Sequence, residues 1–387
     1  MRRLLIISHT PHFRQGNAIV GWGATVREIG YLARIFDSVC HIAPLHSGEP
    51  PANCLQYESP SVEFRPVAAA GGESLRDKLS ILRSYPQYAS IIGSELPKAD
   101  VVHVRCPSNI GLLALAQLKM KATSAQLWVK YAGAWNGYPG EPLSYKLQRQ
   151  WLLRSPGRAV VTVNGTWPAQ PDHVRSFYNP CLTEAEIAEA ADLERPNAEL
   201  RPARLLFAGR LDADKGFPVF LQILRRMRDE GHEVRAEVVG DGPERARYEQ
   251  QAVLDGTAES ISFAGWRTRE QMNEYYGRAD FIVLPSRAEG WPKVLAEAMA
   301  YGAIPLASRV GSIAQYLSEF RTGRSLPELD PAPYCAAIAE YLADPALWRA
   351  ESARARAAAR RFTYDAYLKD VERLLGLDGG ARGANAA

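Results

Sequence analysis

Two glutamates in the C-terminal half of the chain are the residues best placed to do chemistry. Glu289 and Glu297 are separated by seven residues in the segment LPSRAEGWPKVLAEAMAYGAIPLAS. Gly290 follows the first glutamate, and Pro292 stands where a helix could begin. The first turn of a helix attracts anions, because its backbone N–H groups are free and the helix dipole is positive there. The segment therefore predicts a diphosphate site at a helix start, with Glu289 in the loop and Glu297 about one turn into the helix.

The elements around this segment alternate between strand and helix. The apolar runs RLLFAG, EVRAEVVG, SISFAG and FIVLPS each end in glycine, proline or serine, and longer helical patterns separate them. This alternation predicts a parallel sheet that is covered by helices. Ligands of such sheets bind beyond the carboxyl ends of the strands, so we expect the chemistry there.

The N-terminal half shows the same alternation, from LLIIS at residues 4–8, through a helical stretch at Thr25–Phe36, to AVVTVN near Val161. A chain of 387 residues exceeds what one hydrophobic core usually serves, and a polar, proline-containing stretch near residues 196–202 separates the halves. We predict an α/β protein of two Rossmann-like domains that face a cleft. The predicted parts are an N-terminal domain, a C-terminal domain, and a C-terminal helix with a flexible tail, at residues 1–198, 199–365 and 366–387.

Composition excludes several classes of protein. Lys and Arg number 46 against 43 Asp and Glu, so the chain lacks the excess of positive charge typical of nucleic-acid binders. The five cysteines are widely spaced without paired ligand spacing, which predicts a reducing cytoplasm and no structural zinc. The apolar run near the N-terminus is too short for a signal peptide, and no window approaches the roughly 20 apolar residues of a membrane span. Any membrane contact is therefore expected to be peripheral.

With these residues the chain resembles glycosyltransferase family 4, whose members are retaining enzymes of two Rossmann-like domains, the GT-B architecture. A pair of glutamates at this spacing is the hallmark of that family. Further segments that are similar to family landmarks are FAGRLDADKGF, VVGDGPER, FAGW and YNP, which begin at residues 207, 238, 263 and 178. The resemblance covers the C-terminal half densely and the N-terminal half loosely.

The resemblance implies a cationic clamp on the diphosphate of a nucleotide-sugar donor. Arg210 would bind the phosphates as a fork and Lys215 as a point charge, and with Glu289 beside the sugar they form the predicted catalytic set. Glu297 would accept hydrogen bonds from the ribose. The predicted donor-binding set consists of Glu297, Gly290, Trp291, Pro292, Lys293, Val294, Gly265, Trp266, Gly21 and Gly23.

Two backbone segments are implied to approach the donor. The backbone at Gly265 and Trp266 would meet the nucleotide base. VGWGATVREIGYLA, which begins at residue 20, looks like a glycine-rich loop in which Gly21 and Gly23 let the backbone approach the diphosphate. Because cationic side chains and helix N–H groups would stabilise the leaving diphosphate, we expect no metal and no cofactor.

One departure from the family lies in the N-terminal half. Many members carry a histidine after the strand that here reads LWVKYAGAWNGYP, and this chain has Tyr131, Ala132 and Gly133 instead. The role of that histidine near the sugar cannot be carried over. The predicted acceptor-side residues are Trp22, His103, Tyr131 and Trp135, and His9 is a further candidate.

Two motifs are similar to other kinds of binding site, a metal site and a dinucleotide site. Asp212 and Asp214 flank Ala213 in a pattern similar to the acidic metal motif of the other large glycosyltransferase architecture, but a turn before Lys215 predicts solvated carboxylates. GDGPER has Arg245 where a dinucleotide fingerprint needs its third glycine, which favours a tight turn between strand and helix.

We predict a retaining, metal-independent glycosyltransferase that moves a sugar from a nucleotide diphosphate sugar to a glycan or lipid-linked glycan, in bacterial surface or exopolysaccharide biosynthesis. The alternatives are a nucleotide-sugar binding protein without turnover and a sugar-nucleotide epimerase. The predicted location is the cytoplasm, with the inner face of the membrane as one option. The basic cluster Arg354, Arg356, Arg360 and Arg361 is interpreted as a solvated helix face that could touch anionic lipid.

Overall fold

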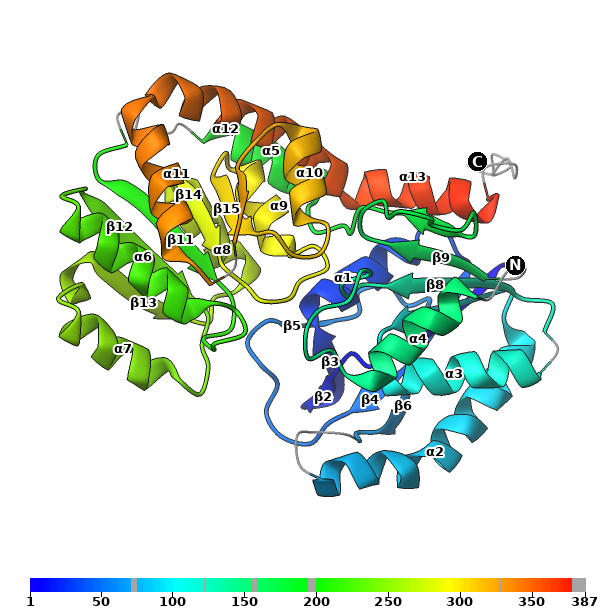
Figure 1. Cartoon of the computed structure of the whole chain (residues 1–387). Helices are drawn as coiled ribbons and strands as arrows, with labels where there is room; N and C mark the ends of the chain where they lie inside the picture. The colour runs from blue at the N-terminus through cyan, green and yellow to red at the C-terminus, as the bar shows by residue number, and fades with distance from the viewer. Residues whose placement is uncertain (71–74, 122, 155–158, 194–199, 328, 378–387) are drawn as a thin grey trace.

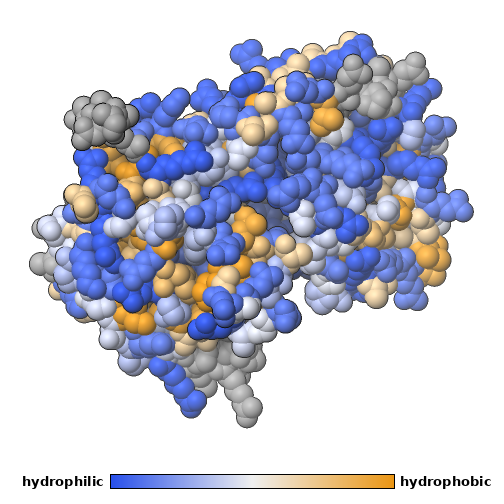
Figure 2. Space-filling view, turned by 180° about the vertical axis from the view of Figure 1, so that it is seen from behind, coloured by the Kyte–Doolittle hydropathy of each residue, from blue (hydrophilic) through white to orange (hydrophobic). Residues whose placement is uncertain are grey.

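The computed structural model describes residues 1–70, 75–121, 123–154, 159–193, 200–327 and 329–377. These residues form two sheets, each covered by helices on both faces, that stand side by side (Figure 1). The surface is notched between the two halves (Figure 2). The prediction of two α/β domains is therefore confirmed.

The N-terminal sheet is mostly parallel, in the order β10-β9-β8-β7-β1-β4-β2-β3-β5, with β6 paired to β4. Its strands are β1 (Arg3–Ile7), β2 (His12–Gln15), β3 (Ala18–Trp22), β4 (Ser38–Leu45), β5 (Cys54–Gln56), β6 (Val62–Ala68), β7 (Val101–Cys106), β8 (Gln126–Tyr131), β9 (Ala159–Val163) and β10 (Val174–Ser176). Its helices are α1 (Gly23–Leu32), α2 (Leu75–Glu95), α3 (Asn109–Met120) and α4 (Leu143–Leu153).

The C-terminal sheet is parallel throughout, in the order β13-β12-β11-β14-β15-β16. Its strands are β11 (Ala203–Ala208), β12 (Val234–Val239), β13 (Ile261–Gly265), β14 (Phe281–Leu284), β15 (Ile304–Ser308) and β16 (Arg324–Leu326). The helices of this half are α5 (Glu184–Asp192), α6 (Phe217–Asp229), α7 (Arg245–Leu254), α8 (Arg269–Arg278), α9 (Lys293–Ala300), α10 (Ile313–Phe320), α11 (Pro331–Ala343) and α12 (Pro345–Ala359), and α13 (Tyr364–Leu375) ends the described chain.

The central strands explain why the sequence folds into this architecture. Every side chain of β14, and all of β1 except Arg3, is buried, as expected for strands that are covered on both faces. Helices such as α6 bury one stripe, which includes Phe217, Phe220 and Leu224, and keep arginines on the other side. Parallel strands with helical crossovers place all their carboxyl ends at one edge of each sheet.

The chain crosses between the two halves twice. The predicted boundary at 198/199 lies among residues 194–199, outside the described residues, as does the tail at 378–387. Before that point, Leu182 and Ile187 already pack into the C-terminal core. At the other end, α13 returns to the N-terminal half, where Tyr367 and Val371 join a core cluster with Leu4 and Ile6. The two ends of the described chain thus lie near each other in the N-terminal half (Figure 1).

Several expected elements differ in their bounds. The helix expected at Thr25–Phe36 begins earlier, at Gly23, and ends at Leu32. The expected glycine-rich loop is a strand followed directly by a helix, with Gly21 inside β3 and Gly23 at the first position of α1. Within the described residues, none of the helices has the length and apolar character needed to cross a bilayer.

We predict that Leu368→Ala in α13 lowers the free energy of unfolding by about 2–5 kcal/mol, because it opens a cavity in the N-terminal core. The side chain of Leu368 is buried in that core, although it lies near the end of the chain. Urea unfolding measures the change, and Lys369→Ala, at an exposed position of the same helix, is the matched control. An unchanged urea midpoint for Leu368→Ala would show that α13 is not part of the cooperative unit.

Candidate functional site

Backbone hydrogen bonds join the loops at the carboxyl edge of the C-terminal sheet. They connect the loops after β13, β12, β11, β14 and β15 in the order in which the strands lie in the sheet. The bonds are Gly240 N–Gly265 O, Leu211 N–Asp241 O, Arg287 N–Asp214 O and Ser312 N–Gly290 O, at 2.9–3.0 Å. Residues distant in the sequence thereby form one continuous surface.

A close approach of two loops within this surface brings Lys215 to Glu289. Gly216 has φ +75°, and a Cβ at this position would lie 1.9 Å from the carbonyl oxygen of Pro285. Only glycine allows this backbone conformation and contact at low cost. The ammonium of Lys215, the preceding residue, lies 2.6 Å from a carboxylate oxygen of Glu289, whose side chain is 12% exposed. Two predicted catalytic residues therefore form an ion pair.

Arg210 lies on the same edge but is more exposed, at 60% of its side chain. Its Nε donates to Asp212, whose other oxygen accepts from the backbone N–H of Lys215 at 2.8 Å. Asp212 thus orders the turn that carries both cations. Among the described residues, no group of three or more His, Cys, Asp or Glu side chains is arranged to hold a metal ion.

Glu297 lies one turn into α9, as predicted, but points to protein partners. Its carboxylate accepts from the hydroxyl of Tyr276 at 2.6 Å and lies 2.9 Å from the Arg269 guanidinium. Arg269 also pairs with Glu186 of α5, at 2.8 Å. The second glutamate of the pair therefore fixes α8 against α5 and α9 in this structure.

The other predicted donor-binding residues divide between edge and core. Trp291 is buried and stacks on Phe362 with ring centres 5.1 Å apart, so only its backbone can face a ligand. Pro292 is buried, and Val294 packs on the C-terminal core. Trp266, after the positive-φ Gly265, is 48% exposed at the end of β13.

Gly290 is one of the points at which the two domains touch. A Cβ there would lie 2.2 Å from the carbonyl oxygen of Ala132, at the carboxyl end of β8, and 3.0 Å from the side-chain amide of Asn164, after β9. The glycine after Glu289 thus serves close packing between the domains. Glu289 is consequently adjacent to the carboxyl edges of both sheets.

Glu28 of α1 is a buried carboxylate that sequence reasoning missed. It is fully buried, and it accepts from Arg105 at 2.8 Å, from Lys130 at 2.7 Å and from the hydroxyl of Tyr367 at 3.1 Å. Lys293, the first residue of α9 and a predicted donor residue, lies 3.9 Å away across the domain boundary. Although burial opposes ionisation of Glu28, the three cations hold its pKa well below the usual value, and burial lowers the pKa of Lys130 to about 7.

A closed ring of hydrogen bonds lies next to the carboxyl end of β1. Its members are Ser8, Thr10, His12, His41 and Tyr57. Burial lowers the pKa of His12 to about 4 and that of His41 well below its usual value, so both imidazoles are neutral at pH 7. The carbonyl of Thr10 can only accept, so His12 Nδ1 carries a proton and donates to it at 2.9 Å. His12 Nε2 must then accept from Tyr57, 2.8 Å away, Tyr57 accepts from His41 Nδ1 at 2.6 Å, and His41 Nε2 accepts from Ser8 at 2.8 Å.

The ring ends where it began, because the backbone N–H of Thr10 donates to the hydroxyl of Ser8 at 3.2 Å. It fixes the loop at the carboxyl end of β1, which carries the exposed His9. It also explains Gly21, where a Cβ would lie 2.4 Å from the His12 ring. Gly23 is required in the same way, because a Cβ would lie 2.5 Å from the carbonyl oxygen of Asn53.

The predicted acceptor-side residues are mostly interior. His103 is fully buried in mid-strand and stacks on Trp128, with ring centres 3.7 Å apart. Tyr131 and Trp135 are buried and meet edge to face. Trp22 is the one of the four that reaches the surface, at 36% exposure.

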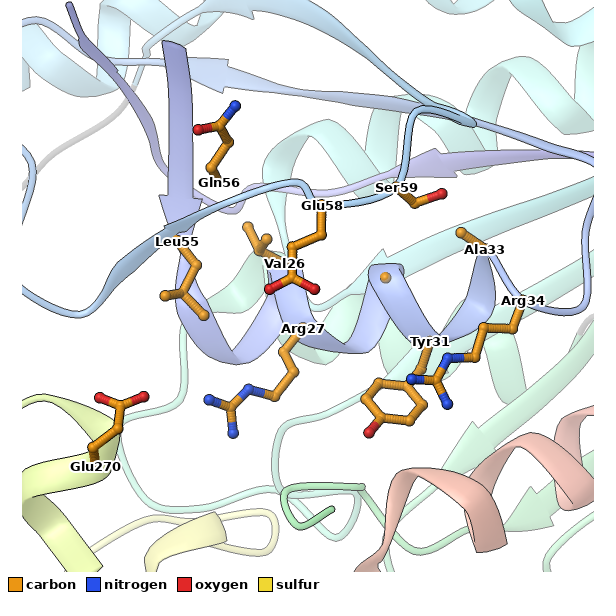
Figure 3. Close-up of a pocket in the computed structure, with 11 residues that line it drawn as sticks. Val26, Arg27, Tyr31, Ala33, Arg34, Leu55, Gln56, Glu58, Ser59 and Glu270 are labelled. Carbon is orange, nitrogen blue, oxygen red and sulfur yellow. The ribbon is translucent and has the colours of Figure 1, made fainter. Parts of the chain in front are cut away.

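A separate pocket of about 390 Å³ lies on the outer side of α1 (Figure 3). Figure 3 shows Arg27, Tyr31 and Arg34 along the helix, with Glu58 from the loop after β5 and Glu270 of α8 opposite. None of the predicted site residues lines it. Its arginines and carboxylates balance in charge, so it does not favour an anionic ligand.

Comparisons with known proteins find glycosyltransferases. The family model for Glycosyl transferases group 1 matches residues 202–344. Glycogen synthase of Mycobacterium tuberculosis is 29% identical over 281 residues, which cover 69% of this chain and 65% of that protein. Lipopolysaccharide 1,2-N-acetylglucosaminetransferase of Salmonella typhimurium is 36% identical over 221 residues, which cover 48% of this chain and 58% of that protein. The chain thus matches less than two thirds of the length of these relatives.

Solved structures show the fold of the whole chain. Sucrose-phosphate synthase from Thermosynechococcus elongatus superposes with a TM-score of 0.72 at 18% identity, covering 97% of this chain and 99% of that one. WaaG, a glycosyltransferase involved in lipopolysaccharide biosynthesis, gives 0.67 at 15% identity, covering 97% and 100%. HepE of Anabaena in complex with UDP and glucose gives 0.69 at 15% identity, with the same coverage. The predicted GT-B fold of two Rossmann-like domains is confirmed.

We predict that Glu28→Gln lowers the free energy of unfolding by about 3–5 kcal/mol at pH 7, because it leaves buried cations without their carboxylate. Because Glu28 raises the pKa of Lys130, which is about 7 in the wild type, this lysine should give up its proton below pH 7 in the variant. The loss should therefore be larger in mild acid, where the unpaired lysine stays charged, than at pH 7. Urea unfolding at several pH values measures both effects. Glu58→Gln, at an exposed position, is the control, and equal urea midpoints for the two variants would contradict the buried network.

The ring of hydrogen bonds predicts acid sensitivity. His12 has a pKa of about 4 in the folded chain against 6.5 when unfolded, so between these values the unfolded chain binds more protons. The free energy of unfolding should therefore fall by about 3 kcal/mol as the pH drops through this window, and His41 adds to the fall. In His12→Gln the fall should be smaller by that amount. The same pH dependence in the variant and the wild type would contradict the assignment.

Proposed function

We propose that this chain transfers a sugar from a nucleotide diphosphate sugar to a glycan or lipid-linked glycan, and the match of residues 202–344 to the family model for Glycosyl transferases group 1 supports this. The observation that carries the proposal is the pairing of Lys215 with Glu289, 2.6 Å apart, at the carboxyl edge where the two domains touch. One sheet edge thus offers cations for a diphosphate and a carboxylate for the sugar. Several relatives are named as transferases of this kind, among them the lipopolysaccharide enzyme of Salmonella.

The proposed mechanism follows from the charges at this edge. Negative charge develops on the diphosphate as the bond to the sugar breaks, and preorganised cations stabilise it. Lys215 is preorganised by Glu289, and Arg210 by Asp212. Departure of the diphosphate on the same face as attack by the acceptor would retain the configuration of the sugar, and this chemistry needs no metal. We therefore propose a retaining, metal-independent reaction.

Glu289 is proposed to contact the sugar rather than the phosphates. Its carboxylate is held by Lys215 on one side and is followed by Gly290, which contacts the N-terminal domain at Ala132. A sugar bound between the domains would meet this carboxylate, and the acceptor would enter from the N-terminal side. His9, exposed at the end of β1, is the histidine that this side offers. Desolvation by neighbouring protein atoms, and secondly the positive charge of Arg105, lower the pKa of His9. At pH 7 His9 would therefore act as a neutral hydrogen-bonding group.

The proposal also includes a biological role and a location in the cell. WaaG is a glycosyltransferase involved in lipopolysaccharide biosynthesis, and the Salmonella relative is a lipopolysaccharide 1,2-N-acetylglucosaminetransferase. We propose a related role in bacterial surface or exopolysaccharide assembly, in the cytoplasm and at the inner face of the membrane. Two members of the predicted arginine cluster lie on α12 and bind within the chain, because Arg356 donates to the carbonyl of Ala190 and Arg354 to that of Arg321.

We predict that Lys215→Ala lowers the rate of sugar transfer about 100- to 1,000-fold, the usual cost of removing one stabilising donor. A thermal-shift screen of UDP, GDP, ADP and TDP with EDTA first finds the donor base, since a ligand at about 100 times its dissociation constant stabilises by roughly 2.7 kcal/mol. Arg247→Ala, which removes an exposed arginine on α7, is the control.

Three outcomes separate the candidate functions. Release of nucleotide with transfer of the sugar to an acceptor, lost in Lys215→Ala but kept in Arg247→Ala, supports the proposal. Binding of a nucleotide sugar without turnover in any acceptor screen would favour a binding protein. Conversion of the donor to an isomer without release of nucleotide would identify an epimerase.

A further inference from the structure

One stretch of the N-terminal domain, residues 101–171, carries a strongly one-sided charge that the proposed chemistry does not use. Residues 101–171 include eight Lys and Arg but a single carboxylate, Glu141, so this stretch has a net charge of +7 in a chain whose total is +3. Glu141 is itself nearly buried and paired with Arg149 of α4. The exposed charge of this stretch is therefore entirely positive.

The exposed cations lie on and beside α3 and α4, which cover the same side of the N-terminal sheet (Figure 1). Lys119 and Lys121 stand at the end of α3, and Lys146 and Arg154 on and after α4. The ammonium of Lys119 is 5.6 Å from the ring centre of Trp151, which joins the end of α3 to α4. We call Lys119, Met120, Lys121, Leu143, Lys146, Leu147 and Arg154 the basic face.

Three members of the basic face are apolar and lie open to solvent. Leu143 and Met120 are each 76% exposed and Leu147 is 63% exposed. Leu143, Leu147 and Arg154 recur at the spacing that keeps side chains on one stripe of a helix, while Gln148 and Leu152 form the buried stripe. A helix that presents leucines and cations together on its outer side is not explained by packing within the chain.

We propose that the basic face docks on a membrane surface that contains anionic lipids. Apolar side chains of an interfacial helix enter the boundary between headgroups and acyl chains, while Lys and Arg meet the negative headgroups. A nucleic acid or an acidic polysaccharide would use the cations but would leave Leu143 and Leu147 in water. The combination of charge and exposed leucine therefore favours lipid.

The position of the basic face links it to the proposed reaction. The loop from Ala132 to Pro142 runs from the carboxyl end of β8, where Ala132 meets Gly290, to the start of α4. The start of α4 is thus joined by this loop to the contact between the domains, and docking through α4 brings this side of the N-terminal domain to the bilayer. A lipid-linked acceptor could then reach the site without leaving the membrane. This last step rests on the proposed function, whereas the docking does not.

The test is co-sedimentation of the full chain with vesicles of phosphatidylcholine alone or mixed with phosphatidylglycerol, without any sugar substrate. We expect binding to the mixed vesicles that weakens with salt, and at least about tenfold weaker binding to the neutral ones. Lys119→Glu/Lys146→Glu should weaken binding by at least about 25-fold, since each lysine near such a surface contributes roughly fivefold. Leu143→Ser/Leu147→Ser should weaken it by about tenfold or more.

The matched controls lie on other surfaces. Val253 and Leu254 of α7 are 65% and 74% exposed, and Val253→Ser/Leu254→Ser should bind vesicles as the wild type does. Arg247→Glu/Arg373→Glu changes the net charge by the same amount as the lysine variant, at side chains that are 75% and 74% exposed. Unchanged melting temperatures show that the variants are folded.

Each other outcome overturns the proposal. In the first, the chain binds neither kind of vesicle. In the second, the control variants lose as much vesicle binding as the variants of the basic face. In the third, Leu143→Ser/Leu147→Ser binds as the wild type does, and a soluble polyanion displaces the chain from the vesicles. The last would assign the face to an anionic polymer. Nucleotide-sugar binding and turnover in solution are measured separately, so failure of docking and failure of the proposed function are told apart.

Discussion

The candidate site depends on how closely two loops of the C-terminal sheet approach each other. At Gly216 the backbone has a positive φ and lies against the carbonyl of Pro285 with no room for a side chain. This contact places Lys215 beside Glu289, although 73 residues separate them in the sequence. The hydrogen bond from Arg287 to Asp214 holds the same two loops further out. The chemistry proposed here is thus a consequence of backbone packing at one glycine.

A second constraint, at Glu28, relates the domains to each other. Its carboxylate gathers side chains from β7, β8 and the terminal helix α13, and Lys293 approaches it from the C-terminal domain. A buried carboxylate is costly unless it is paired, and three cations offset that cost. Lys293 begins the helix that follows Glu289 and Gly290, so the position of the Glu289 loop and the network inside the N-terminal domain are mechanically linked.

The sequence predicted the architecture well, because strand and helix alternation is a local signal. Resemblance rather than geometry also grouped Glu289, Arg210 and Lys215, and the structure places all three at one sheet edge. It could not show that Trp291 stacks in the core or that Glu297 is held by Tyr276, since neighbours in a motif can point in opposite directions. The ring of Ser8, His41, Tyr57 and His12 joins residues from separate strands and loops, and no spacing in the sequence reveals it. The one signal available in the sequence was Gly21. We expected a ligand to occupy the space next to this glycine, but the His12 ring occupies it.

The ion pair of Lys215 and Glu289 also constrains how a diphosphate can bind. Each of the two groups neutralises the other at 2.6 Å, so an arriving diphosphate must share Lys215 with a carboxylate that repels it. Arg210 is the cation better able to move, because most of its side chain is exposed and its partner Asp212 lies two residues away. We therefore infer that Arg210 would bind the phosphates, while Lys215 would remain paired with Glu289, where the sugar would lie.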